Sequence, residues 1–282
     1  MGLFNFLKSK NDIHDANLFY NLDLAKKYIE LLAPSKLSKS GIEELKNNLV
    51  LSGMNDDEAH AAMLYSVNDF DNAVNIYSQL SNLQPKSMYM LGTCYLYGRG
   101  TTKDTYKAFE LLKLASVNQC ADAMFFLSIC FEQGVGTTVD LKKASEWEKK
   151  ALDLNVPRAF FYRAIKHHTG IGAQKDINLT FKSLQKADMD LAYYSLGYMY
   201  KHGLGTDINH KKAFELFKKS SECWDIRGIL ELVNYYVNGL AGTRDLDKAI
   251  YWETVLYNIS KDETEMDTDK FRRTLEKIIS MK

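Results

Sequence analysis

The chain has 282 residues, with 36 lysines and arginines balanced by 36 aspartates and glutamates, and 46% of its residues are hydrophobic. This length and composition are enough for one large or two medium folded domains, and the absence of net charge argues against a protein that binds nucleic acid or an anionic membrane. No apolar run is long enough for a transmembrane helix, and the first ten residues lack the layout of a signal peptide, so we expect a cytoplasmic protein.

The sequence pattern of the first 85 residues predicts helices. The whole chain has three prolines, and each follows a helix-like apolar stretch, so prolines mark helix boundaries in a largely helical protein. We expect residues 1–16 to be a flexible or capping segment and Asn17–Ala33 to form a helix. Ser40 and Asn55 each stand three residues before a glutamate, which is the capping-box pattern that opens a helix.

Residues 58–67 and 69–77, followed by Pro85, are similar to the two helices of a tetratricopeptide repeat. The helical pattern continues from there into the rest of the chain. Residues 17–85 therefore predict N-terminal helices that include one divergent tetratricopeptide-like unit, which leads directly into the segment that follows.

A short motif with two glycines recurs after Pro85. The separations between its leading glycines are 36, 36, 33 and 36 residues, and the glycines are Gly98, Gly134, Gly170, Gly203 and Gly239. The second glycine follows two residues later, except in the fifth copy, where Ala241 replaces it. Such regular spacing does not arise by chance, and it indicates an internal repeat.

The residues around each leading glycine predict a helix–turn–helix unit. Small and apolar residues 11, 7, 4 and 3 positions before it share one helix face, and glycine ends that helix by adopting a left-handed conformation. An Asp or Asn six positions after it is suited to cap a second helix. Lys-Ala follows at nine and ten positions in four copies, whereas the third copy has Leu179-Thr180.

This pattern resembles the Sel1-like repeat family, a relative of the tetratricopeptide repeats, over residues 86–260. The resemblance implies an all-α fold: a right-handed α-α superhelix of about five helix pairs. Thr268–Ile279 predicts an amphipathic closing helix within a capping segment, residues 261–282. We therefore expect one continuous solenoid with caps.

The same resemblance implies a concave groove, because positions 12, 5, 2 and 1 before the leading glycine line that surface in tetratricopeptide proteins. Its candidate anchors are apolar or aromatic: Leu96, Tyr97, Ile129, Ile165 and Tyr198. Candidates for register and specificity are charged: Asp122, Glu132, Arg158, Lys201 and Arg227. The remaining candidates are Thr93, His168, His202 and Asn234. These residues either contact a partner or pack against the adjacent repeat, and we favour the interface.

The catalytic alternative is weaker. Glu132, His168 and His202 would be the residue types for an acid–base pair or a metal, but each belongs to a different repeat. Some secreted members of the family are hydrolases of β-lactams, yet those have regularly paired cysteines. Here only Cys94 and Cys130 share a repeat position, and no cysteine has a zinc-site partner. We therefore expect no catalytic residue, no metal and no cofactor.

The predicted function is non-catalytic binding of another protein along the groove, as an adaptor, a scaffold or an inhibitor. The family resemblance also implies a bacterial alternative, an immunity protein that neutralises a toxin acting in the cytoplasm. A hydrolase that uses the His/Glu cluster is the second alternative. We expect a monomer in the absence of the partner, with no nucleic-acid or membrane partner.

Overall fold

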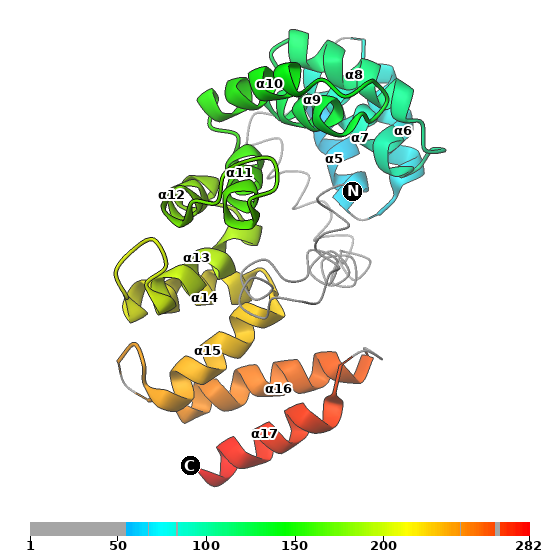
Figure 1. Ribbon diagram of the computed structural model, residues 1–282. Helices are drawn as coiled ribbons and strands as arrows, with labels where there is room; N and C mark the ends of the chain where they lie inside the picture. The colour runs from blue at the N-terminus through cyan, green and yellow to red at the C-terminus, as the bar shows by residue number, and fades with distance from the viewer. Residues whose placement is uncertain (1–54, 67, 83, 243, 263–265) are drawn as a thin grey trace. The chain divides into compact units, whose positions relative to one another are not determined.

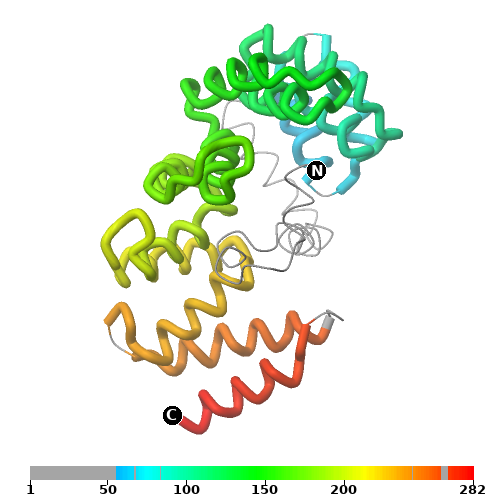
Figure 2. The backbone as a smooth tube through the Cα atoms, viewed as in Figure 1, coloured from blue at the N-terminus to red at the C-terminus, as the bar shows by residue number. Residues whose placement is uncertain are grey.

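The computed structural model describes residues 55–66, 68–82, 84–242, 244–262 and 266–282, and every regular element in these residues is an α-helix. The described residues belong to two compact units, 55–159 and 160–282. The helices, drawn in Figures 1 and 2, are α5 (Asp56–Ser66), α6 (Phe70–Leu80), α7 (Pro85–Tyr97), α8 (Thr105–Val117), α9 (Ala121–Gln133), α10 (Leu141–Asp153), α11 (Pro157–Thr169), α12 (Ile177–Ala187), α13 (Asp190–His202), α14 (His210–Glu222), α15 (Ile226–Asn238), α16 (Leu246–Asp262) and α17 (Thr268–Ser280). The all-α fold class is confirmed.

Among the described residues, the first N-terminal helix begins where the sequence predicts. The backbone N–H of Glu58 donates to Oδ1 of Asn55 at 2.8 Å, which is half of the predicted capping box. Helices α5, α6 and α7 then share a core that includes Ala61, Ala73, Tyr77 and Leu91. The expected helix over residues 17–33, the one that opens at residue 40 and the segment 1–16 lie outside the described residues.

Each repeated turn ends the first helix of its pair at the leading glycine. The five leading glycines have φ between 64° and 77°, the left-handed conformation that the motif predicts. The second glycine has a further role. A Cβ at Gly136 would lie 2.0 Å from the carbonyl oxygen of Thr105, the first residue of α8. At Gly100 it would lie 2.3 Å from the carbonyl oxygen of Phe70, the first residue of α6. The second glycine therefore allows a turn to press against the preceding helix pair.

The predicted caps form in all five copies. The Asp or Asn side chain accepts a hydrogen bond from a backbone N–H of the second helix at 2.9–3.0 Å, and the residues are Asp104, Asp140, Asp176, Asn209 and Asp245. The backbone N–H of the same residue donates to the carbonyl nine residues earlier, as from Asp140 to Phe131 at 2.9 Å. Each turn is thus closed at both ends.

The lysine of the Lys-Ala motif packs on an aromatic ring of its own repeat. Its ammonium lies 5.1–5.5 Å from the ring centroid in four copies, in the pairs Lys107–Tyr95, Lys143–Phe131, Lys212–Tyr200 and Lys248–Tyr236. The third copy lacks both partners, because His167 replaces the aromatic residue and Leu179 the lysine. There Nδ1 of His167 instead lies 3.0 Å from the carbonyl oxygen of Gln174. Each copy therefore has both the lysine and its Tyr or Phe partner, which together we call the clamp, or has neither.

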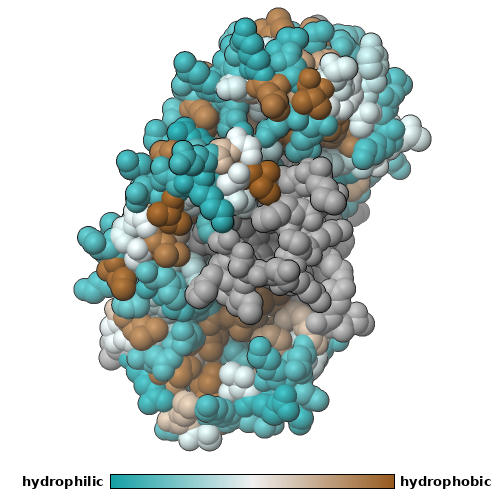
Figure 3. All heavy atoms as spheres, in the orientation of Figure 1, coloured by the Kyte–Doolittle hydropathy of each residue, from teal (hydrophilic) through white to brown (hydrophobic). Residues whose placement is uncertain are grey.

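Helix α17 covers the apolar faces of α15 and α16. Its Phe271 and Ile278 join a core with Ile229, Val233 and Leu256. Asp267 caps the helix by accepting from the backbone N–H of Lys270 at 2.9 Å. On the face drawn in Figure 3, hydrophilic residues cover most of the described surface, with hydrophobic residues in smaller groups between them. The predicted closing helix over residues 268–279 is present.

Candidate protein-binding face

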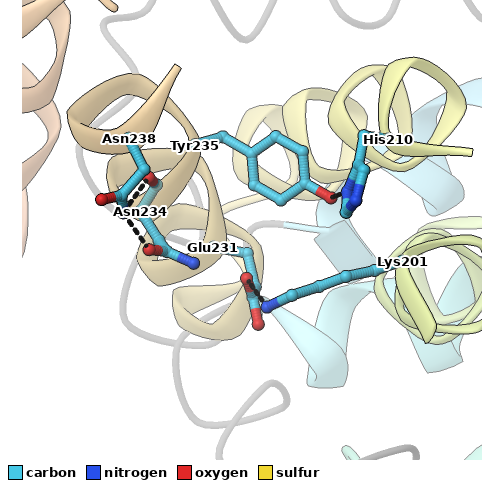
Figure 4. A network of polar contacts seen from close by, with 6 residues as sticks. All are labelled: Lys201, His210, Glu231, Asn234, Tyr235 and Asn238. Atoms are coloured by element: carbon cyan, nitrogen blue, oxygen red, sulfur yellow. Dashed lines mark hydrogen bonds and ion pairs between the residues drawn. The ribbon is translucent and has the colours of Figure 1, made fainter. Parts of the chain in front are cut away.

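An ion pair connects the first helices of the fourth and fifth repeats. Nζ of Lys201 on α13 lies 2.6 Å from Oε2 of Glu231 on α15, and the two side chains are 19% and 17% exposed. Figure 4 shows Lys201 extending from α13 to the carboxylate on α15. Because partial burial screens the pair less than bulk water would, it holds the two helices in register.

A second contact links the same two helices, one turn earlier on α15 and two turns earlier on α13. The guanidinium of Arg227 lies 4.3 Å from the ring centroid of Tyr194 on α13. The same guanidinium forms a two-point pair with Asp225, at 2.9 Å to Oδ1 and 2.7 Å to Oδ2. Burial raises the pKa of Tyr194, although the positive charge of Arg227 opposes that rise. Arg227 is therefore fixed by both a ring and a carboxylate before any partner arrives.

Because an α-helix has 3.6 residues per turn, residues of α15 that are three or four apart share a side, either the open side or the side that faces the core. Nδ2 of Asn238 donates to Oδ1 of Asn234 at 2.6 Å, one turn apart on the same face as Glu231. Tyr235 points instead toward α14, where its hydroxyl lies 3.0 Å from Nδ1 of His210 (Figure 4). Burial, and then the charge of Glu231, raise the pKa of Tyr235 to about 12. We use the name α13–α15 face for the surface formed by Lys201, His202, Arg227, Glu231, Asn234 and Asn238.

Two of the five predicted anchors are buried, which corrects the expectation that they leave an open apolar surface. Tyr198 is 7% exposed and Ile165 is 4% exposed. The ring of Tyr198 packs between that of His202, at 4.3 Å between centroids, and that of Tyr194 at 6.2 Å. Thr93 is also buried, and its hydroxyl donates to the carbonyl of Met90 at 2.7 Å. The ring of Tyr198 is thus covered by side chains of its own helix.

The other predicted anchors and charged candidates of the first unit lie nearer the surface. Tyr97 is 51% exposed, and the guanidinium of Arg99 lies 5.6 Å from its ring centroid. Nη1 of Arg99 also donates to the hydroxyl of Tyr65 at 2.6 Å. Arg158 is exposed, and the remaining candidates are half-buried: Leu96, Asp122, Ile129 and Glu132.

The sequence reasoning missed Glu231 and the partner of Arg227, Asp225. Glu231 stands eight residues before its leading glycine, where the other copies have uncharged residues: Met90, Phe126, Tyr162 and Ser195. A single charged residue at a position that is uncharged in the other copies was a signal that the sequence offered. The pairing of Asp225 with Arg227 had no repeat pattern behind it.

The three residues considered for the catalytic alternative do not all belong to one unit of the structure. Glu132 belongs to α9 in the unit 55–159, whereas His168 on α11 and His202 on α13 belong to the unit 160–282. Within the residues that the structure describes, no group of three or more His, Cys, Asp or Glu side chains is arranged to hold a metal ion. All four cysteines are free thiols, and burial raises the pKa of Cys94 to about 11 and that of Cys130 to about 12.

None of the helices in the described part of the chain combines the length and the apolar character needed to cross a membrane.

The repeat pattern matches a known family. The family model described as Sel1 repeat matches residues 85–116, 121–156, 190–223 and 234–252. The chain is a Sel1-repeat protein. The match omits the third copy and covers part of the fifth, which are the two copies in which the motif departs from the others. No protein of curated function matches the sequence.

Solved Sel1-repeat structures share the α-solenoid fold. The crystal structure of a Sel1 repeat protein from Oxalobacter formigenes has a TM-score of 0.59 and 22% identity over 79% of this chain and 98% of that one. A protective antigen of uropathogenic Escherichia coli strains has a TM-score of 0.58 and 18% identity over 90% of this chain and 58% of that one. The crystal structure of an immunity protein from Pseudomonas aeruginosa has a TM-score of 0.48 and 19% identity, over 67% of this chain and 74% of that one. This similarity is too low to bear on function.

Proposed function

We propose that this Sel1-repeat protein is a non-catalytic interaction module that binds another protein on the α13–α15 face. The Sel1 repeat fold implies a protein–protein interaction module, which supports binding in general. The particular face is supported by the ion pair Lys201–Glu231, which joins two successive repeats at 2.6 Å while both side chains stay partly exposed. A surface whose charged groups are already held loses less conformational entropy when a partner binds.

The composition of the α13–α15 face fits this role. Arg227 is a residue type that dominates the energetics of protein interfaces, and its guanidinium rests on the buried ring of Tyr194. His202 and Asn238 are exposed at the ends of α13 and α15, and Leu230 on α15 is 40% exposed. The face therefore combines a fixed arginine with an exposed histidine and a polar rim, next to an exposed leucine.

The test is to capture the partner from a lysate of the source organism, identify it and measure its affinity with purified components. Asn238→Arg places a bulky charge on the proposed face and is expected to weaken binding by at least tenfold. The matched control is Asn178→Arg, an exposed asparagine at the start of α12, which is expected to leave affinity unchanged. Both variants should keep the wild-type circular dichroism. Equal affinities of wild type and Asn238→Arg would refute the proposed face.

The identity of the captured protein separates the roles. A partner enzyme that loses its activity when bound makes the chain an inhibitor, and a toxin in that position makes it an immunity protein. A partner whose activity is unchanged, and which is held together with a third protein, makes the chain an adaptor or scaffold.

A further inference from the structure

A groove of about 610 Å³ is lined mainly by residues of α14 and by none of the residues of the α13–α15 face. Its apolar lining includes Leu196 on α13 and Phe214 and Leu216 on α14, all of them half-buried. Its volume falls in the range of about 300–1,000 Å³ that is typical of ligand pockets. The lining comes from residues 185–241, which belong to a single unit of the structure.

The groove is present where the fifth repeat departs from the motif. In the preceding turn, a Cβ at Gly205 would lie 2.7 Å from the carbonyl oxygen of Ile177, the first residue of α12. The corresponding residue of the fifth copy is Ala241, whose methyl group prevents so close an approach, and Ala241 lines the groove. A Cβ at the neighbouring Gly242 would meet nothing within 4 Å. The turn of the fifth copy therefore borders an open space, where the turn of the fourth copy makes a tight contact.

The charged lining of the groove has an excess of positive charge. Lys211, Lys212 and Lys219 line it together with one acidic residue, Glu215, in a chain that has no net charge. The ammonium groups of Lys212 and Lys219 lie 5.1 and 5.0 Å from the ring centroids of Tyr200 and Tyr193. These two charges are thus held at the groove by aromatic rings.

We propose that this groove is a second docking site, and that it takes an acidic peptide segment with one large apolar side chain. The apolar side chain would lie against Leu196 and Leu216, and the flanking carboxylates would face the three lysines. Charge complementarity selects this occupant, because a basic or neutral segment would leave the lysines uncompensated. The site shares no residue with the α13–α15 face, so the two can fail independently.

The test uses defined probes and fluorescence anisotropy. A labelled Asp-Glu-Phe-Glu-Asp peptide is compared with Asp-Glu-Ser-Glu-Asp, which lacks the anchor, and with Lys-Arg-Phe-Arg-Lys, which reverses the charge. We expect saturable binding of the first peptide and at least tenfold weaker binding of the other two. Raising the ionic strength from about 0.01 M to about 0.15 M shortens the Debye length from about 30 Å to about 8 Å and should weaken the first peptide's binding further.

Protein variants then locate the site. The double variant Lys211→Glu/Lys219→Glu should bind the first peptide at least tenfold more weakly. The control Lys182→Glu/Lys218→Glu makes the same change of charge at exposed lysines on α12 and α14 that do not line the groove, and should bind normally. The proposal is overturned if the acidic Phe peptide does not bind, if all three peptides bind equally, or if the control loses as much affinity as the groove variant.

Discussion

A buried glutamate in the C-terminal core provides a direct test of the packing. Glu253 on α16 is 1% exposed, on the same helix face as Ala249 and Leu256. It stands 14 residues after its leading glycine, and three other copies have a fully buried apolar residue there: Leu112, Leu184 and Phe217. Burial raises the pKa of Glu253 from its ordinary 4.5 to about 7, against a smaller opposing effect of Lys270.

The sign of the pH dependence follows from linkage. The folded state holds the proton of Glu253 more tightly than the unfolded state does, so the free energy of unfolding falls as pH rises from about 4.5 to about 7, and then levels off. With 1.36 kcal/mol for each pKa unit, the loss between about pH 5 and about pH 8 is roughly 2–3 kcal/mol. Glu253→Gln removes this titration.

Urea titrations followed by circular dichroism would measure the effect. The stability advantage of Glu253→Gln over wild type should grow by roughly 2–3 kcal/mol between about pH 5 and about pH 8. The control Glu276→Gln, at an exposed position on α17, should give a constant difference. If wild type and Glu253→Gln changed in parallel with pH, Glu253 would not titrate as a buried group, and the reasoning would be refuted.

The remaining predictions concern the repeat itself. Gly136→Ala should lower the free energy of unfolding by about 3 kcal/mol, because the new methyl group overlaps the carbonyl of Thr105 and the backbone at this position is left-handed. Urea unfolding measures this loss. A loss below about 1 kcal/mol would mean that the contact is not tight. His167→Tyr with Leu179→Lys should rebuild the missing clamp of the third copy. A double-mutant cycle should then give a favourable coupling of about 0.5–1 kcal/mol, and additive single effects would contradict the clamp.

The repeat period predicted most of the local structure, because helix ends and caps depend on nearby residues. The leading glycines and the capping residues lie where the spacing placed them, and the closing helix α17 lies where the amphipathic pattern placed it. The second glycine was interpreted only as part of a turn. Its tight contact, between Gly136 and Thr105 for example, is made to the preceding helix pair and depends on the distance between pairs.

The candidate face was harder to predict because it depends on side-chain depth. The analogy with the concave positions of tetratricopeptide repeats identified the helix face that bears Lys201 and Arg227. It does not say how far neighbouring side chains cover an aromatic ring, and it therefore wrongly predicts an open ring at Tyr198. The pairing of Lys201 with Glu231 required knowledge of the spacing between α13 and α15. An interface stays a prediction at every candidate position.

Site-specific photo-cross-linking in the source organism tests the central claim most directly. A photoreactive amino acid is placed at position 234, on the α13–α15 face, or at the exposed position 182 of α12. We predict that a partner protein is cross-linked from position 234 and not from position 182. Cross-linking from position 182 alone, or from neither position while the partner is bound, would contradict the assignment of the binding face.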